Sequence, residues 1–184
     1  MKLIVILFVL LLTSACSFNE TTKSVDEKIM ESVAFPQSTK IIYIENFKNG
    51  VIVLYQDKTG FRSDFFILKE NYFVHGGNAE LNPEDGLSWT MRNDPHIPIA
   101  LFGGVITDEM IEKVIVKQRT VEQIAKIIDI NDGKRYWFAV FDILEESLNG
   151  EADPLKIEAY NKKGNLYWKS GVYEDRLFEG KTNK

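Results

Sequence analysis

The stretch KIIYIENFKNGVIVLYQ, residues 40–56, decides the fold. Its first part, residues 41–47, places apolar side chains with a period of two, as a β-strand does. Asn49-Gly50 then separates this part from a second apolar run at residues 51–55. An Asn-Gly step between two such runs is the strongest short-range signal of a hairpin, because a type I′ turn needs positive φ at both central residues. We therefore expect two antiparallel strands joined by a turn at Asn49-Gly50.

The same turn chemistry recurs along the chain. Further predicted turns lie at Asp57-Lys58-Thr59-Gly60, Glu70-Asn71, Asp132-Gly133 and Lys163-Gly164. The strands that they join are residues 62–69, 72–74, 124–130, 136–141, 155–160 and 166–168. Many short strands joined by tight turns are typical of an antiparallel sandwich or barrel. The sequence therefore predicts a mainly β protein, specifically an antiparallel β-sandwich.

Residues 120–130 fit two structures. Their apolar side chains have the spacing of an amphipathic helix, but they also alternate with a period of two. The Asp132-Gly133 step that follows leads into an obvious strand, which favours a strand ending at Ile130.

One short helix is expected near the N-terminus. Ser24 and Glu27 have the spacing of a capping box, and apolar residues follow at every fourth position. Phe35-Pro36 ends the pattern, because proline disfavours helical geometry at the residue before it. The helix is therefore predicted to reach about Ala34.

The N-terminus has the order of a secretory signal peptide. Lys2 supplies a positive charge, residues 3–12 are apolar, and small residues lead to Cys16. The apolar run is too short for a transmembrane helix, which needs roughly 20 residues. We expect residues 1–15 to be a signal peptide and residues 16–23 to be a tether.

The residues Leu12-Thr13-Ser14-Ala15-Cys16 resemble the lipobox of bacterial lipoproteins, with Thr13 where that family usually has an aliphatic residue. The resemblance implies cleavage before Cys16, lipidation of its thiol with diacylglycerol, and often acylation of its amine. Two acyl chains would hold the protein firmly at a membrane, at about 0.8 kcal/mol per buried CH₂. The alternative is an ordinary secretory signal that happens to end near a cysteine.

Composition limits the remaining domain, residues 24–184. Cys16 is the only cysteine, so no disulfide can form within this domain. The net charge is −5, and removing residues 1–15, which hold one lysine and no acid, would change it to −6. The overall field of an acidic domain does not attract nucleic acid or teichoic-type polyanions. We therefore expect one domain that binds no nucleic acid.

A second resemblance covers residues 103–168. Gly104-Val105-Ile106, Val114-Ile115-Val116, Tyr136-Trp137-Phe138 and Ala159-Tyr160-Asn161 occur there in order. This series resembles a small β-sandwich module of uncharacterised exported proteins and lipoproteins of Gram-positive bacteria. The resemblance implies a sandwich fold and an extracytoplasmic location, and the family brings no assigned activity.

The search for catalytic and metal-binding motifs is mostly negative. His75 precedes Gly76-Gly77, and His96 lies two residues after Asp94, so a hydrolase built on these groups is one alternative. The acidic runs 78–86 and 145–153 do not meet the requirements of an EF-hand loop. We expect no catalytic residue, no metal site and no cofactor.

Aromatic residues provide the better binding hypothesis. Trp137 and Trp168 lie in strands with large rings on both faces, and one face of each sheet in a sandwich meets solvent. They are candidate binding residues, with Trp89, Arg92 and His96 as a second candidate patch. The alternative is that the rings pack in the core.

These observations predict a membrane-anchored, extracytoplasmic lipoprotein that acts as a non-enzymatic binding module of the cell envelope. Its expected partners are the membrane, through Cys16, and an envelope protein or glycan. The alternatives are the hydrolase that uses His96, Asp94 and His75, and a purely structural envelope protein.

Overall fold

The computed structural model describes residues 23–70, 72–74, 83–94, 96–97, 99–142 and 154–182. The predicted signal peptide, Cys16 and most of the tether lie outside the described residues, as do His75 and most of both acidic runs. The predictions made for them are therefore not tested by the fold.

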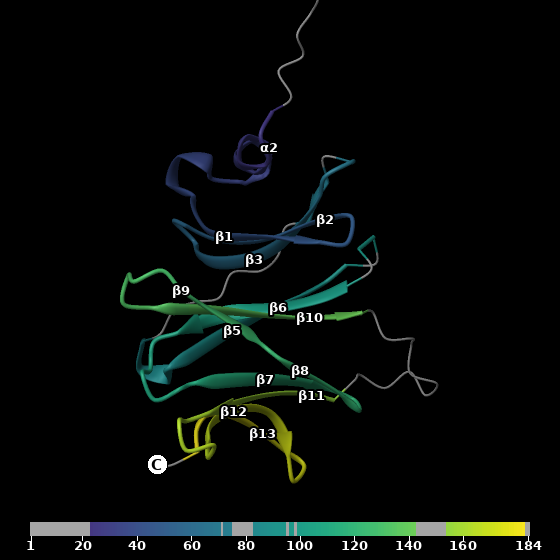
Figure 1. Ribbon diagram of the computed structural model, residues 1–184. Coiled ribbons are helices and arrows are strands. Elements are labelled where there is room, and N and C mark those ends of the chain that lie inside the picture. Colours follow the sequence, from purple (N-terminus) through teal and green to yellow (C-terminus); the bar gives the residue numbers. More distant parts are fainter. Residues whose placement is uncertain are drawn as a thin grey trace, which may run out of the picture.

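The described strands form three antiparallel sheets that lie in layers, A on B on C (Figure 1). Sheet A has the strand order β1 (Lys40–Phe47), β2 (Gly50–Asp57), β3 (Gly60–Ile67), β4 (Tyr72–Val74). Sheet B has the order β5 (Leu87–Asn93), β6 (Ile99–Ile106), β10 (Arg135–Asp142), β9 (Lys126–Asp129). Sheet C has the order β13 (Arg176–Lys181), β12 (Leu166–Tyr173), β11 (Leu155–Tyr160), β7 (Lys113–Gln118), β8 (Val121–Ile124). The mainly β, sandwich-like fold is confirmed, with a third layer.

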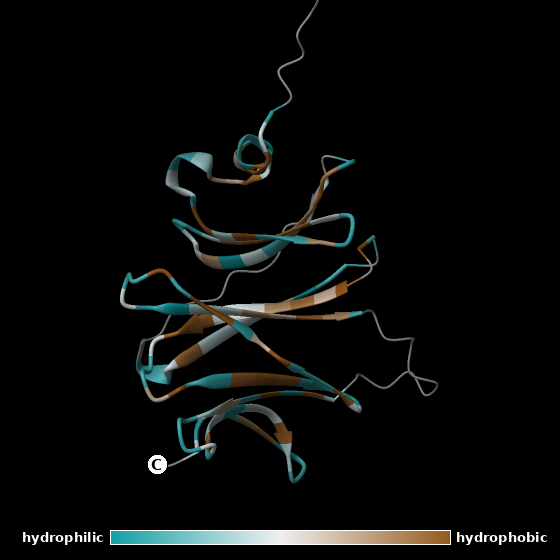
Figure 2. Cartoon of the chain, in the orientation of Figure 1, coloured by the Kyte–Doolittle hydropathy of each residue, from teal (hydrophilic) through white to brown (hydrophobic). Residues whose placement is uncertain are grey.

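Sheet B is the central layer and is buried on both sides. All eight residues of β6 are buried, and they alternate between two cores. Leu101 and Val105 pack in the core between sheets A and B, whereas Phe102 and Ile106 pack in the core between sheets B and C. Figure 2 shows the apolar residues of these strands and the polar turns between them. Tight packing on both sides makes sheet B the rigid centre of the molecule.

One helix, α2 (Val25–Ser32), covers sheet A. The predicted capping box is present, with Glu27 N bonded to the Ser24 hydroxyl at 3.2 Å and Ser24 N to the Glu27 carboxylate at 2.8 Å. Ile29 and Val33 are buried against the face of sheet A that points away from sheet B. Two single-turn 3₁₀ helices complete the described elements, η1 (Pro36–Ser38) and η2 (Pro83–Asp85). In the described ranges, no helix is both long and apolar enough to span a bilayer.

The first hairpin forms, but its turn differs from the prediction by one residue. Phe47 pairs with Gly50, so Lys48 and Asn49 make the turn, and Lys48 takes the positive φ of 49°. Gly50 is instead the first residue of β2, where a Cβ would lie 2.3 Å from the carbonyl oxygen of Phe66. The glycine is therefore needed for a close approach of backbone in the sheet, and not for the conformation of the turn.

Residues 121–129 are extended, as the period of two predicted, but they form two strands. β8 pairs with β7 in sheet C, and β9 pairs with β10 in sheet B. Ala125 lies between them, buried, with its backbone N–H bonded to the carbonyl of Val114 at 2.9 Å. A strand that changes sheets at a bend is a common way to close the edge of a sandwich.

Candidate functional site

Trp137 and Trp168, the two predicted aromatic anchors, lie in the core. Both side chains are fully buried between sheets B and C, and Trp89 is half-buried against the same core. The indole N–H of Trp137 donates to the carbonyl of Ser88 at 3.3 Å. These two rings are therefore core residues, which is the alternative that the sequence left open. Neither Trp137 nor Trp168 offers a surface to a ligand.

Arg92 is buried as well, in an ion pair that joins sheet B to sheet A. Its guanidinium lies 2.5 Å from the carboxylate of Asp64, and the hydroxyl of Tyr55 donates to the same carboxylate at 2.7 Å. Burial raises the pKa of Asp64 to about 6, against the opposing effects of Arg92 and Tyr55. The pair links β5 of sheet B to β3 of sheet A in the interior, so Arg92 has a structural role.

His96 is exposed and pairs with Asp94, as the sequence suggested. The ring Nδ1 of His96 lies 2.9 Å from Asp94 Oδ1, which also accepts from the backbone N–H of His96 at 2.8 Å. The backbone hydrogen bond is the largest of the effects that lower the pKa of Asp94. A short Asx turn explains both contacts. Because His75 lies outside the described residues, the convergence that a hydrolase would need is not tested.

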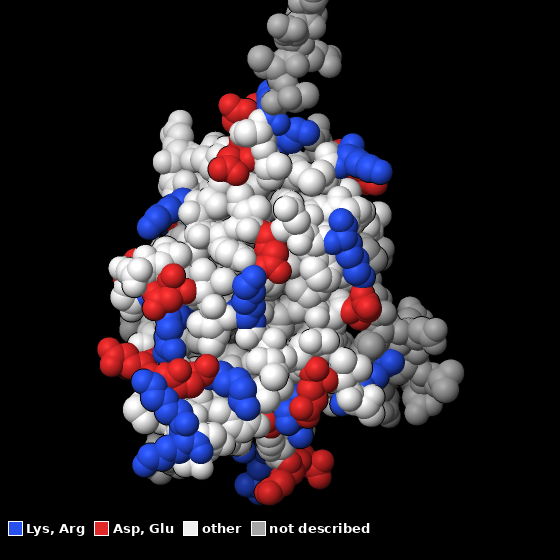
Figure 3. Space-filling view, viewed as in Figure 1, with Lys and Arg blue, Asp and Glu red and all other residues white. Residues whose placement is uncertain are grey.

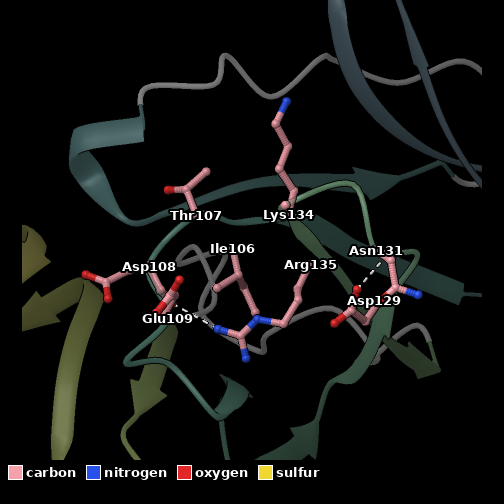
Figure 4. A pocket seen from close by; sticks show the side chains of 9 residues that line it. Ile106, Thr107, Asp108, Glu109, Asp129, Asn131, Lys134 and Arg135 are labelled. Atoms are coloured by element: carbon pink, nitrogen blue, oxygen red, sulfur yellow. Dashed lines mark hydrogen bonds between the residues drawn. The ribbon is translucent and has the colours of Figure 1, made fainter.

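A hollow of about 340 Å³ lies where the turn after β6 meets the β9–β10 hairpin (Figure 4). Asp108 accepts hydrogen bonds there from the Tyr167 hydroxyl at 2.9 Å and the Lys181 ammonium at 2.7 Å. Burial opposes the ionisation of Asp108, but these bonds outweigh it and lower its pKa. Arg135 donates to the carbonyl of Asp108 at 2.9 Å. These bonds link sheets B and C, so Asp108 and Arg135 have a structural role at this hollow.

The strongest candidate is the outer face of sheet C, which points away from sheet B. Along β7, β11 and β12, the residues that enter the core alternate with residues that point outward. Strand pairing places the outward residues side by side, and no described element lies beyond them (Figure 1). The outer face of sheet C includes Lys113, Ile115, Lys117, Glu122, Ile124, Lys156, Glu158, Tyr160, Lys169, Gly171, Tyr173, Arg176 and Phe178.

Glu158 holds two tyrosines at the centre of this face. Its carboxylate accepts from the Tyr160 hydroxyl at 2.5 Å and from the Tyr173 hydroxyl at 3.1 Å, and it pairs with Lys117 at 3.0 Å. Burial opposes the ionisation of Glu158, but the three partners outweigh it and hold its pKa below the usual value. Desolvation and the same carboxylate raise the pKa of both tyrosines. The two rings are therefore fixed in the free protein.

Lysine ammonium groups lie over these rings. Lys113 is 4.8 Å from the ring centre of Tyr160, and Lys156 is 4.5 Å from that of Tyr173. Lys169 lies 4.1 Å from the ring of Tyr173 and 4.7 Å from that of Phe178. At partly exposed sites each such contact contributes about 0.5–1 kcal/mol. The face is thus a platform of aromatic rings and cations.

A hollow of about 470 Å³ lies over the β11–β13 part of this face, where Figure 1 shows β12 and β13 curving. Gly171, at the centre of β12, has a φ of +131°, and a Cβ there would lie 2.5 Å from the carbonyl oxygen of Leu155. Glycines with unusual backbone angles bend sheets. The bend gives the outer face a depression large enough for part of a ligand.

The outer face of sheet C is locally basic in a chain that is acidic overall. Within the described residues, Lys113, Lys156, Lys169 and Arg176 make no ion pair, and Lys117 alone pairs with carboxylates. Figure 3 shows lysine and arginine side chains gathered over the lower layers, among acidic ones. The described residues contain no cluster of three His, Cys, Asp or Glu side chains that could hold a metal.

Sequence reasoning missed this site. The sequence shows part of the site, because Lys156, Glu158 and Tyr160 stand at alternate positions of one strand. The residues of β7, β12 and β13 come to lie beside them only through strand pairing. Comparison with protein-family models, with curated proteins and with solved structures found no match for this chain.

Proposed function

We propose that this protein is a membrane-anchored, extracytoplasmic lipoprotein that acts as a non-enzymatic binding module, with the outer face of sheet C as its binding surface. The lipid would be carried by Cys16, in a segment that resembles a lipobox.

The position of sheet C carries this proposal. The described chain begins at Lys23, beside α2, and sheet C is the layer at the opposite end of the stack (Figure 1). If the lipid is on Cys16, residues 17–23 can separate it from the domain by at most about 25 Å. An anchor at the α2 end would leave the outer face of sheet C directed away from the membrane, where envelope ligands can reach it.

The anchor is tested by replacing Cys16. In a Gram-positive expression host, the unchanged chain should incorporate labelled palmitate and sediment with membranes, and globomycin should block its processing. Cys16→Ser should lose the label and leave the membrane fraction. A Cys16→Ser chain that still sediments with vesicles at unchanged mass contradicts the anchor.

Display of the binding surface is tested with a thiol reagent that does not cross membranes. Because Cys16 is the only cysteine, a Lys169→Cys variant has one additional thiol on sheet C. We expect this thiol to react on intact cells, and the unchanged chain, whose cysteine carries lipid, to remain unlabelled. Reaction only after lysis contradicts extracytoplasmic display.

The hydrolase alternative depends on the Asp94–His96 pair. The Asx turn explains that pair without catalysis, and His96 has a side chain that is 75 % exposed. We therefore favour the binding module.

A further inference from the structure

We propose that the ligand of the outer face of sheet C is an anionic polysaccharide. This inference rests on the proposed function and specifies its substrate class. Sugar rings would lie on the aromatic platform, and the carboxylate or phosphate groups of the polymer would bind the surrounding cations.

The charges of the depression support an anionic ligand. Lys156, Lys169 and Arg176 line it without an ion-pair partner among the described residues, and Glu174 is the carboxylate that lines it with them. One exposed ammonium contributes little binding energy, but several cations around one depression attract anions and orient them. Lys113 extends the basic surface onto β7, whereas Lys117 is paired with Glu122 and Glu158.

The aromatic rings support a sugar. Tyr160 and Tyr173 use their hydroxyl groups on Glu158, so a ligand would meet their rings and the lysine ammonium groups that lie over them. A pyranose ring would displace these ammonium groups and pack its C–H groups on the rings, while the displaced ammonium groups bind the anionic groups of the polymer. Phe178 extends the row of rings across β13. Since the rings are held in place before binding, the ligand does not have to order them. Glu158 is therefore a positioning residue.

The edge of sheet C argues against an acidic peptide as the ligand. Peptides that bind sheets usually add a strand to an exposed edge. Sheet C has two edges. At β13, Gly180 has a φ of +134° and Arg176, Glu179 and Lys181 are charged, and the other edge, β8, is only 4 residues long. Charges and irregular backbone are features that prevent strand addition. The cations also lie on the face of the sheet, which suits a chain of sugars lying across the strands.

The test uses the full chain in detergent micelles and polygalacturonate, a sugar polymer with one carboxylate per unit, as the probe. We expect binding that weakens with salt and no binding of uncharged dextran. Lys156→Ala combined with Lys169→Ala should weaken binding about tenfold. The matched control, Lys28→Ala combined with Lys40→Ala, removes the same charge from α2 and from β1 of sheet A and should leave binding unchanged.

A Tyr173→Phe variant tests positioning. It keeps the ring and loses the hydrogen bond to Glu158, so polygalacturonate binding should weaken while binding keeps its salt dependence. Poly-L-glutamate of the same length should bind at least about tenfold more weakly than polygalacturonate, because it offers charge without sugar rings.

Three results would overturn the inference: no polygalacturonate binding by a folded chain, equal binding of poly-L-glutamate, or equal loss in the Lys28/Lys40 control. The anchor and display experiments are independent of these results. A chain that is anchored and displayed but does not bind the probe retains the proposed function and loses this inference. A chain that binds the probe but carries no lipid retains this inference and loses the proposed membrane anchor.

Discussion

Sheets B and C both contain strands rich in aromatic residues, but only the central strands of sheet B, β6 and β10, bury all of theirs. In β10, Tyr136, Trp137 and Phe138 enter the cores above and below the sheet. In sheet C, Trp168 is in the core, whereas Tyr173 and Phe178 lie on the outer face with lysines over them. The difference comes from the number of layers that cover each sheet. A ring therefore becomes a core residue or a binding residue according to its layer.

The largest expected effect distinguishes the two layers directly. Trp137→Ala removes a fully buried ring from the core between sheets B and C and should lower the free energy of unfolding by about 4 kcal/mol. Phe178→Ala, on the outer face, should lower it by less than about 1 kcal/mol. Urea denaturation of both variants measures the difference. Equal losses would show that the outer face of sheet C is covered.

The buried ion pair gives the next effect. Arg92→Ala leaves the carboxylate of Asp64 buried without its cation and should cost about 3 kcal/mol. Adding Asp64→Asn to Arg92→Ala should recover part of the loss. Lys126→Ala, which breaks the exposed pair with Glu45, should cost under about 1 kcal/mol. If Arg92→Ala lowers the free energy of unfolding no more than Lys126→Ala does, the pair of Arg92 and Asp64 is exposed to solvent and the account is contradicted.

The bend of sheet C should be sensitive to a single methyl group. Gly171→Ala adds a Cβ 2.5 Å from a backbone oxygen at a φ of +131°, and we expect a cost of about 2 kcal/mol. Gly164→Ala is the control, because its φ is also positive, at +79°, but no atom lies within 4 Å of the added Cβ. It should cost about 1 kcal/mol. Thermal denaturation of both variants tests the difference, and the Gly171 variant should also bind polygalacturonate less well.

The smallest effect is a difference in pH dependence between two buried carboxylates. Asp64 has a folded pKa of about 6, above its ordinary 3.8, so its contribution to stability is full below about pH 4 and is lost as the pH rises through 6. The pKa of Glu158 is lowered from its ordinary value of 4.5. Its contribution to stability is therefore present above pH 4.5 and is lost as the pH falls through the folded pKa.

Unfolding free energies of the unchanged chain, Asp64→Asn and Glu158→Gln from pH 3 to 7 measure both contributions. The unfolding free energy lost in Asp64→Asn should shrink as the pH rises. The unfolding free energy lost in Glu158→Gln should grow over the same range. Changes in the same direction would show that one of the two environments is assigned incorrectly.

The hairpins could be predicted from the sequence because their signals are local. The capping box at Ser24 and the turns at Gly133 and Gly164 each depend on a few neighbouring residues, and all are present. The turn at Asn49-Gly50 was displaced by one residue, because a contact with Phe66, in another strand, decides where the glycine is needed.

The third layer could not be predicted in this way. Residues 99–106 are apolar on both faces, so the alternation that reveals a half-buried strand is absent. The outer face of sheet C was missed for a related reason. Lys113 and Tyr160 come together only because β7 pairs with β11, far along the chain, and overall charge does not reveal how cations are distributed.

A titration of the full chain with polygalacturonate, followed by NMR chemical shifts, tests the central claim most directly. If the open face of the last layer is the binding surface, shifts should concentrate at Lys156, Lys169, Tyr173 and Phe178, and the buried rings of β10 should remain unaffected. Shifts centred on Trp89 and His96, or none at saturating probe, would contradict the account.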